Sequence, residues 1–177
     1  SQRDAVNRQA NELAESVSQG LAASHPPVTL GPDHIAAAVQ SLLRMFDPVQ
    51  GGFGFAPKFP QPVLLEFLFD VREAVDDETR NAVDHAIRFS LDRMMVGGLH
   101  DHVGGGFHRY CVDGTWTVPH FEKMLYDNAQ LISVFARSAK VFGDAEHRRA
   151  AERAIAYVHR EMTSSGGGFL SAQDAEV

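Results

Sequence analysis

One pattern occurs three times in this chain: GGFGFAPKFP at residues 51–60, GGGFHRYCVD at 104–113 and GGGFLSAQDAEV at 166–177. The first phenylalanines of the three copies, Phe53, Phe107 and Phe169, are 54 and 62 residues apart. A glycine after a helix can serve as a simple C-cap, but three copies in register favour a repeated loop on one rim. We therefore expect the three loops to lie together, with these phenylalanines as buried anchors.

Six helices are predicted around these loops, because apolar residues recur three and four positions apart. Their expected spans are Arg3 to Ser24, Pro32 to Asp47, 61–75, Asp76 or Asp77 to Gly97, Pro119 to Phe142, and 145 to Thr163. Proline suits the first turn of a helix and glycine follows its end, and we expect Asp76 or Asp77 to cap the fourth helix and Asp144 the sixth. Because each helical pair in a repeat buries its inner face against the next pair, the pattern predicts an all-α protein with toroidal or solenoidal architecture.

The composition excludes several classes of function. The chain has 177 residues, of which 44% are hydrophobic and 22% charged, and these values are typical of a globular domain. A formal charge of −7 leaves no positive field for a phosphate backbone or an anionic bilayer. No apolar run approaches the roughly 20 residues that cross a bilayer, and the N-terminus does not resemble a signal peptide. We expect a cytoplasmic protein with neither nucleic acid nor a membrane as partner.

The single cysteine, Cys111, excludes an intramolecular disulfide and a CxxC redox pair within this chain. Because Cys111 lies close to His108 and Arg109, it could be an activated nucleophile. A small, partly buried and inert cysteine is the commoner state, and we favour that interpretation.

Three long motifs carry a family resemblance: GGFGFAPKFPQP, GGLHDHVGGGFHRYCVDGTWTVPHFEKMLYDNAQL and GGGFLSAQDAEV. Together they resemble the thioredoxin-domain-containing spermatogenesis-associated protein family, strongly over about residues 40–177. The resemblance implies an (α/α)6 toroid of six helical hairpins, similar to N-acylglucosamine 2-epimerases and certain glycosidases, after an N-terminal thioredoxin-like domain. We expect residues 1–177 to be a single domain, the N-terminal half of that toroid, cut from a longer protein that also contains the thioredoxin-like domain as a partner.

Histidines concentrate in the middle of the chain. Residues 100–120 contain four of the nine, where chance would place about one. In an extended segment His100 and His102 would point to one side of the backbone and Asp101 to the other. Such a pair could bind Zn or Fe, but the helical HxxxH motif is absent. Histidines that brace the loop or bind sugar hydroxyls are favoured, so we expect no metal and no other cofactor.

A helix beginning at Pro119 would place Glu122 and Lys123 in its first turn, four residues before Tyr126 and Asp127. Glu122 would be stabilised at a helix start in any case, but a polar start on an otherwise apolar helix also fits a pocket at the rim. The candidates for an acid and a base are Glu122, His120, Asp101 and His102. The candidates for ligand contact are His100, His108, Arg109, Trp116, Lys123, Tyr126, Asp127, Lys58, Gln173 and Asp174.

The sequence is compatible with three functions. The first is a carbohydrate-active toroid that binds a sugar or similar polyol and uses an acid and a base for epimerase or glycosidase chemistry. The second is a non-catalytic domain that binds a small ligand or docks the thioredoxin-like domain. The third is a metal-dependent enzyme, which metal analysis of the purified chain would distinguish from the other two.

We also expect the isolated 177-residue chain to self-associate through its C-terminal helical hairpin, or else to keep that hairpin poorly ordered. The predicted fifth helix is apolar on two faces and the sixth can cover only part of it, and large exposed apolar patches are rare on monomers. Light scattering tests this expectation. A monodisperse monomer with slow hydrogen exchange throughout residues 119–162 would contradict it.

Overall fold

The computed structural model describes residues 2–22, 29 and 31–175. The chain divides into two compact units, Ser1–Gly31 and Pro32–Val177. The first unit contains α1 (Gln2–Ala22), which agrees with the predicted helix except that residues 23 and 24 lie outside the described part. The second unit contains α2 (Pro32–Met45), α3 (Pro62–Val71), α4 (Asp77–Val96), α5 (Leu125–Phe142) and α6 (Ala145–Glu161). A single domain over residues 1–177 stays a prediction.

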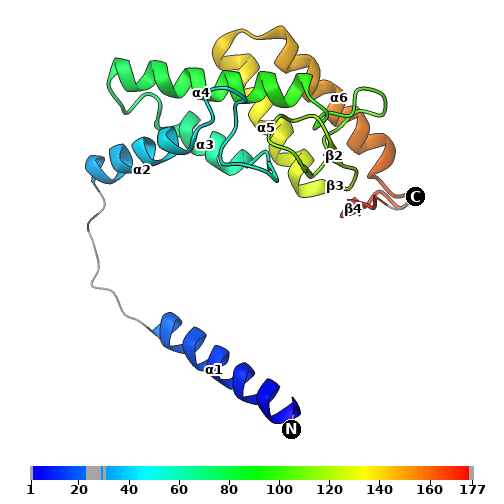
Figure 1. The fold of residues 1–177 in the computed structure, drawn as a ribbon. Helices are drawn as coiled ribbons and strands as arrows, with labels where there is room; N and C mark the ends of the chain where they lie inside the picture. Colours follow the sequence, from blue (N-terminus) through cyan, green and yellow to red (C-terminus); the bar gives the residue numbers. More distant parts are fainter. Residues whose placement is uncertain (1, 23–28, 30, 176–177) are drawn as a thin grey trace. The chain divides into compact units, whose positions relative to one another are not determined.

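In the second unit, α3 and α5 lie side by side in one layer, and α4 and α6 form the other (Figure 1). The two layers enclose one core, whose fully buried members include Leu65, Leu68, Ile87, Leu91, Leu131 and Phe135. Ala150, Ala151 and Ala154 supply the buried face of α6, and their small side chains allow close packing against α5. Each large buried side chain stabilises the fold by about 1.5–3 kcal/mol.

Aspartates begin two of the helices as the sequence predicted. The side chain of Asp76 accepts a hydrogen bond from the Thr79 amide at the start of α4, and Asp144 accepts from two amides at the start of α6. Such caps satisfy donors that have no partner within the helix. None of the described helices is both long and apolar enough to cross a membrane.

The first two glycine-rich loops contain the same turn, built around Asp47 and Asp101. In each turn the aspartate carbonyl accepts a hydrogen bond from the amide four residues later, at 2.8 and 2.9 Å. Each carboxylate also accepts two amide hydrogen bonds of 2.8–2.9 Å within the turn. The paired glycines that follow have positive φ angles, which favour glycine. The underlying pattern, D-x-x-x-G-G-F at 47–53 and 101–107, is visible in the sequence but was not part of the predicted repeat.

A buried lysine neutralises each of these aspartates. Lys58 Nζ lies 2.6 Å from Asp47 Oδ2 and 3.2 Å from the Gly114 carbonyl oxygen, and its side chain is fully buried. Lys123 Nζ lies 2.6 Å from Asp101 Oδ2 and 2.9 Å from the Gly105 carbonyl oxygen. Trp116 lies under the first ammonium at 5.4 Å and Tyr157 under the second at 4.3 Å. Because an unpaired buried charge is very costly, each lysine must stay in contact with its aspartate. This contact holds the loop in place.

Short antiparallel pairings join the three loops. Lys58 pairs with Cys111, β1 (Tyr110–Cys111) with β2 (Pro119–His120), and β3 (Lys123–Met124) with β4 (Ala172–Gln173). This confirms that the loops lie together. Phe53 and Phe107 are buried as predicted, but Phe169 is 60% exposed, so the third anchor was wrong. The second loop pairs with the first through Lys58 and Cys111. In the described part of the chain no further loop packs against the third loop in this way, and Phe169 stays exposed.

The start of α5 differs from the prediction, because the helix begins at Leu125 and not at Pro119. The backbone between them is extended: the Glu122 carbonyl accepts from the Arg109 amide at 2.8 Å, and the Leu125 amide donates to the Ser171 carbonyl at 2.9 Å. Pairing with distant segments thus outweighs the local preference of proline for a helix start. Lys123 accordingly pairs with Asp101 and not with Asp127.

Replacing the buried lysine of the first loop tests its structural role. We expect Lys58→Met to lower the free energy of unfolding by about 3 kcal/mol, because the carboxylate of Asp47 loses its partner inside the loop. The matched control is Lys140→Met on the exposed side of α5, with an expected change within about 0.5 kcal/mol. Urea denaturation followed by circular dichroism measures both, and equal stabilities for the two variants would contradict the assigned role.

Candidate functional site

Five polar residues come together where the second loop meets the start of α5: His108, Arg109, His120, Glu122 and Asp127, here called the rim cluster. Arg109 Nη1 lies 2.9 Å from Glu122 Oε2. Arg109 and Glu122 lie close enough to Asp127 for their charges to affect its pKa, and His120 lies close enough to His108 to affect the pKa of that ring. All five were candidates from the sequence, so the structure brings together an acid, a base and three ligand-contact candidates.

Asp127 is the most perturbed carboxyl of the rim cluster. Its side chain is in the first turn of α5 and only 8% of the residue is exposed. Burial raises the pKa of Asp127 to about 6; the Arg109 cation opposes this shift and the Glu122 carboxylate adds to it. A carboxyl with a pKa near neutrality can both donate and accept a proton, and such groups concentrate at functional sites.

The rim cluster also holds buried polar atoms without a hydrogen-bond partner in the protein. They are His108 Nδ1, Arg109 Nε, His120 Nδ1 and Asp127 Oδ2. Native proteins leave few such atoms unpaired, because each costs about 1–3 kcal/mol. Four of them within 20 residues of sequence therefore indicate a place where water or a polar ligand completes the hydrogen bonding.

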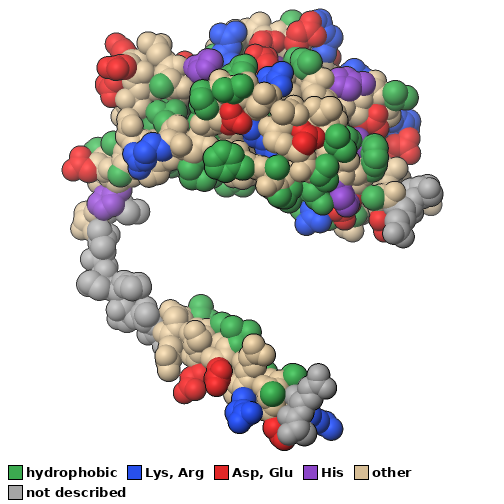
Figure 2. Space-filling model, viewed as in Figure 1, with side chains coloured by type: hydrophobic (Ala, Val, Ile, Leu, Met, Phe, Trp, Pro, Cys, Tyr) green, Lys and Arg blue, Asp and Glu red, His purple; other side chains and the backbone are tan. Residues whose placement is uncertain are grey.

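Aromatic rings border the rim cluster. His120 stacks on Tyr110 at a centroid distance of 4.8 Å, and Tyr110 stacks on Phe59 at 4.7 Å. Phe121 meets the His108 ring edge to face at 5.4 Å and is 64% exposed. Hydrophobic side chains are gathered on this side of the second unit in the space-filling view (Figure 2). The rim cluster thus combines flat apolar surfaces with unpaired polar atoms.

Several other candidates contribute to the packing of the loops. Trp116 is fully buried and donates from Nε1 to the Gln50 carbonyl at 2.9 Å, next to Lys58. Gln173 accepts a hydrogen bond of 2.7 Å from the hydroxyl of Tyr157, the residue that lies over Lys123. Direct contact of these side chains with a ligand stays a prediction, as it does for Asp174 and Tyr126.

Asp101 and Cys111 are both in states that disfavour proton transfer at neutral pH. Burial would raise the pKa of Asp101, but hydrogen bonds from Lys123 and from the amides of Gly104 and Val103 outweigh it and hold the pKa well below its usual range. Burial, and then the nearby Asp113 carboxylate, raise the pKa of Cys111 to about 12. The structure therefore favours a charged structural aspartate and an inert thiol.

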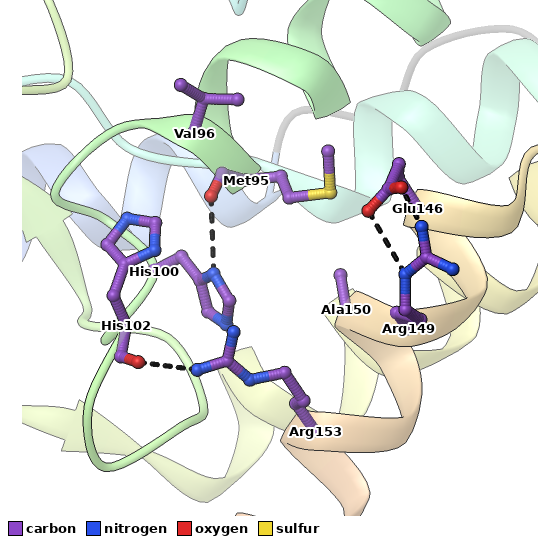
Figure 3. Close-up of a pocket in the computed structure, with 8 residues that line it drawn as sticks. All are labelled: Met95, Val96, His100, His102, Glu146, Arg149, Ala150 and Arg153. Atoms are coloured by element: carbon purple, nitrogen blue, oxygen red, sulfur yellow. Dashed lines mark hydrogen bonds and ion pairs between the residues drawn. The ribbon is translucent and has the colours of Figure 1, made fainter.

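His100 and His102 lie in a different cavity, together with residues of α4 and α6 (Figure 3). None of the residues that line this cavity belongs to the rim cluster. The sequence pattern also predicts one polar cleft containing His102, His120, Glu122 and Asp127, but the structure places His102 in this cavity without the other three.

Among the described residues one group has the spacing of metal ligands: Asp92, Asp144 and His147, whose ligand atoms lie within 4.8 Å of one another. His147 is fully buried, with Nδ1 2.8 Å from Ser138 Oγ and Nε2 3.0 Å from Asp92 Oδ1. These contacts connect α4, α5 and α6, so hydrogen bonding within the protein accounts for this histidine. Sequence reasoning missed this group because Asp92 is in α4, far along the chain from Asp144 and His147 at the start of α6.

A second residue that the sequence reasoning missed is Asn128, which is fully buried at the start of α5. Its amide accepts from the Phe107 N–H at 2.8 Å and donates to the Phe107 carbonyl at 3.0 Å. Asn128 thereby fixes the second loop against α5 and determines where Asp127 lies. Its position directly after Asp127 in DNAQL was the only available signal.

The raised pKa of Asp127 predicts a pH-dependent stability. Between about pH 4 and pH 6 the folded chain binds this proton and the unfolded chain does not, so Asp127 makes the free energy of unfolding fall as the pH rises. Asp127→Asn removes this effect, and its stability relative to wild type should increase by about 2 kcal/mol across that interval. Urea denaturation from pH 4 to 7 measures it. Exposed Asp33→Asn is the matched control, and a D127N profile parallel to wild type would show that Asp127 titrates normally.

Comparison with known proteins identifies relatives of the chain. Spermatogenesis-associated protein 20 of Mus musculus and of Homo sapiens are each 43% identical to the chain over 140 residues, which is 77% of this chain. The chain spans about a fifth of the length of these relatives, since the alignment covers 18% of each. No protein-family model matches the chain.

Solved structures agree on the fold. A sugar epimerase from a ruminal bacterium superimposes with a TM-score of 0.65 at 15% identity, over 82% of this chain and 40% of the epimerase. The cellobiose 2-epimerase of Spirochaeta thermophila gives a TM-score of 0.65 at 21% identity, over 82% and 39% of the two chains. These likenesses confirm the predicted all-α partial toroid of helical hairpins. The aligned part of the chain is therefore similar to part of spermatogenesis-associated protein 20, and it folds as part of an (α/α)6 toroid.

Proposed function

We propose that the rim cluster binds a sugar or a similar polyol and supports acid–base chemistry of the epimerase or glycosidase type. The observation that carries this proposal is the set of four buried polar atoms without partners in the rim cluster. A sugar hydroxyl both donates and accepts hydrogen bonds, so neighbouring hydroxyls on one ring can satisfy donors and acceptors together. The exposed face of Phe121 offers a flat apolar surface for the ring.

The residues of the rim cluster divide into distinct roles in this proposal. Asp127 exchanges a proton with the substrate, because its pKa of about 6 leaves both protonation states populated near neutral pH. His120, whose buried Nδ1 has no hydrogen-bond partner in the protein, is the second proton-transfer group. Arg109 holds Glu122 in place through their ion pair. Hydrolysis would use two carboxyls, Asp127 and Glu122, whereas epimerisation would use a base and an acid on opposite sides of one carbon.

The comparisons support the fold component of this proposal. Similar structures are described as epimerases of sugars, and one of them as an epimerase of cellobiose. A shared fold is a weak warrant for a shared activity, so the chemistry rests on the rim cluster. Of the four acid–base candidates from the sequence, Glu122 and His120 belong to the rim cluster, while Asp101 is bound to Lys123 and His102 lines another cavity.

A non-catalytic docking surface is the second candidate function. Phe55 is 91% exposed and Phe121 is 64% exposed, and exposed aromatic side chains are enriched at protein–protein interfaces. A thioredoxin-like domain of the longer protein is the expected partner in this case.

Ligand-dependent stabilisation of the purified chain tests the sugar proposal. We expect cellobiose, glucose, mannose or N-acetylglucosamine to raise the melting temperature of the wild-type chain. Glu122→Gln should abolish this rise and leave the unliganded melting temperature nearly unchanged, because Glu122 is partly exposed and lies outside α5. Differential scanning fluorimetry measures both, and Glu152→Gln on the exposed side of α6 is the matched control.

Two results would count against the proposal. An equal ligand-dependent rise in E122Q and wild type would show that sugars bind elsewhere. If no sugar in the series raises the melting temperature while a thioredoxin-like domain of a family member binds the chain, the docking function would be favoured instead.

A further inference from the structure

The cavity that contains His100 and His102 lies apart from the rim cluster and has its own chemistry (Figure 3). Its volume is about 310 Å³ and its apolar wall is formed by Met95 and Val96 at the end of α4 and by Ala150 on α6. Its polar groups are the two histidines, the Glu146 carboxylate and the guanidinium groups of Arg149 and Arg153. A small molecule of roughly the size of a sugar fits this volume.

His100, which lines this cavity, has a buried hydrogen-bond acceptor without a partner in the protein. Its Nδ1 lies 3.2 Å from the Met95 carbonyl oxygen, and because a carbonyl only accepts, Nδ1 carries the proton. Burial, together with the nearby Arg153, lowers the pKa of His100 to about 4, so the ring is neutral at physiological pH. The lone pair on Nε2 then has no partner, although the residue is only 3% exposed. A buried acceptor of this kind calls for a donor from a ligand or a water.

The two arginines give the cavity an excess of positive charge. The Arg153 guanidinium lies beside the His100 ring, and its Nη2 donates to the His102 carbonyl at 2.6 Å (Figure 3). That bond uses one of the five N–H donors of the guanidinium. Arg149 is paired with Glu146, but both side chains are about 60% exposed, and such pairs contribute little and exchange readily. With one carboxylate against two guanidinium groups, the cavity favours an anion over a metal cation.

We infer that this cavity is a binding site for a small hydroxylated oxyanion, the chemistry that a sugar phosphate and a sugar acid share. A ligand hydroxyl donates to His100 Nε2, and the phosphate or carboxylate group binds Arg153, with Arg149 as a second cation. The apolar wall covers the carbon skeleton of the ligand. This site is independent of the rim cluster, because the two have no residue in common.

Titration of the chain labelled with ¹⁵N-histidine tests the inference directly. Glycerol 3-phosphate and gluconate represent the two sources of the oxyanion, and glycerol and inorganic phosphate each lack one half of the ligand. We expect one or both hydroxylated anions to shift the Nε2 resonance of His100 in a saturable manner, with a much weaker effect of glycerol or phosphate alone. The stronger of the two identifies whether the site prefers a phosphate or a carboxylate.

Variants separate this cavity from other cationic surfaces. Arg153→Met should weaken binding by about tenfold, while the matched control Arg148→Met, also on α6 but outside the cavity, should bind as wild type does. Since Arg153 also holds the loop at His102, Arg149→Met serves as a second variant with an expected loss of about threefold. Glu122→Gln in the rim cluster should leave this binding unchanged.

Three outcomes would overturn the inference. The first is that neither anion binds at millimolar concentration. The second is that binding occurs without a change at His100. The third is that a folded Arg153→Met or Arg149→Met variant binds as tightly as wild type, which would place the anion elsewhere on the surface.

Discussion

A buried lysine side chain needs partners for its charge, and this need determines how the glycine-rich loops are arranged. The rest of the structure depends on that arrangement. Lys58 is fully buried, and its ammonium contacts Asp47 Oδ2, the Gly114 carbonyl and the face of Trp116. A charge in that position is tolerated only if every one of these groups is in place. The first loop therefore cannot move independently of the end of α2 or of the second loop, and Lys123 imposes the same condition on the second and third loops.

The rim cluster follows from this arrangement. Because Lys123 points to Asp101, the backbone before α5 is extended, and the Glu122 carbonyl pairs with the Arg109 amide. The same extension sets the two side chains close enough for an ion pair and delays the helix to Leu125, so that Asp127 falls in its buried first turn. The perturbed pKa of Asp127 is thus a consequence of how the second loop is held.

The histidines of the central segment divide between two environments of different chemistry. His108 and His120 join carboxyl groups and aromatic rings in the rim cluster, where donors and acceptors without partners match the hydroxyls of a sugar. His100 and His102 face guanidinium groups in the other cavity, where a neutral imidazole and positive charge match a hydroxylated anion. A single run of sequence therefore contributes to two sites, because His100 and His102 flank the turn at Asp101 beside α4 and α6, whereas His108 and His120 lie farther along the chain near the start of α5.

The sequence by itself determined the helices, their caps and the association of the glycine-rich loops, since apolar periodicity, Asp76, Asp144 and paired glycines act through contacts within a few residues. It also named every member of the rim cluster, because the polar residues of 108–127 stand out in an apolar region. Only the tertiary structure decided which of them meet. The start of α5, the burial of Lys58 and the role of Asn128 depend on hydrogen bonds and packing between residues 11 to 56 positions apart. The exposure of Phe169 reflects the lack of a covering loop in the described part of the chain. Local propensity contains no information on such contacts, and the energy of burying a paired charge or amide exceeds the preference of a single proline for a helix start.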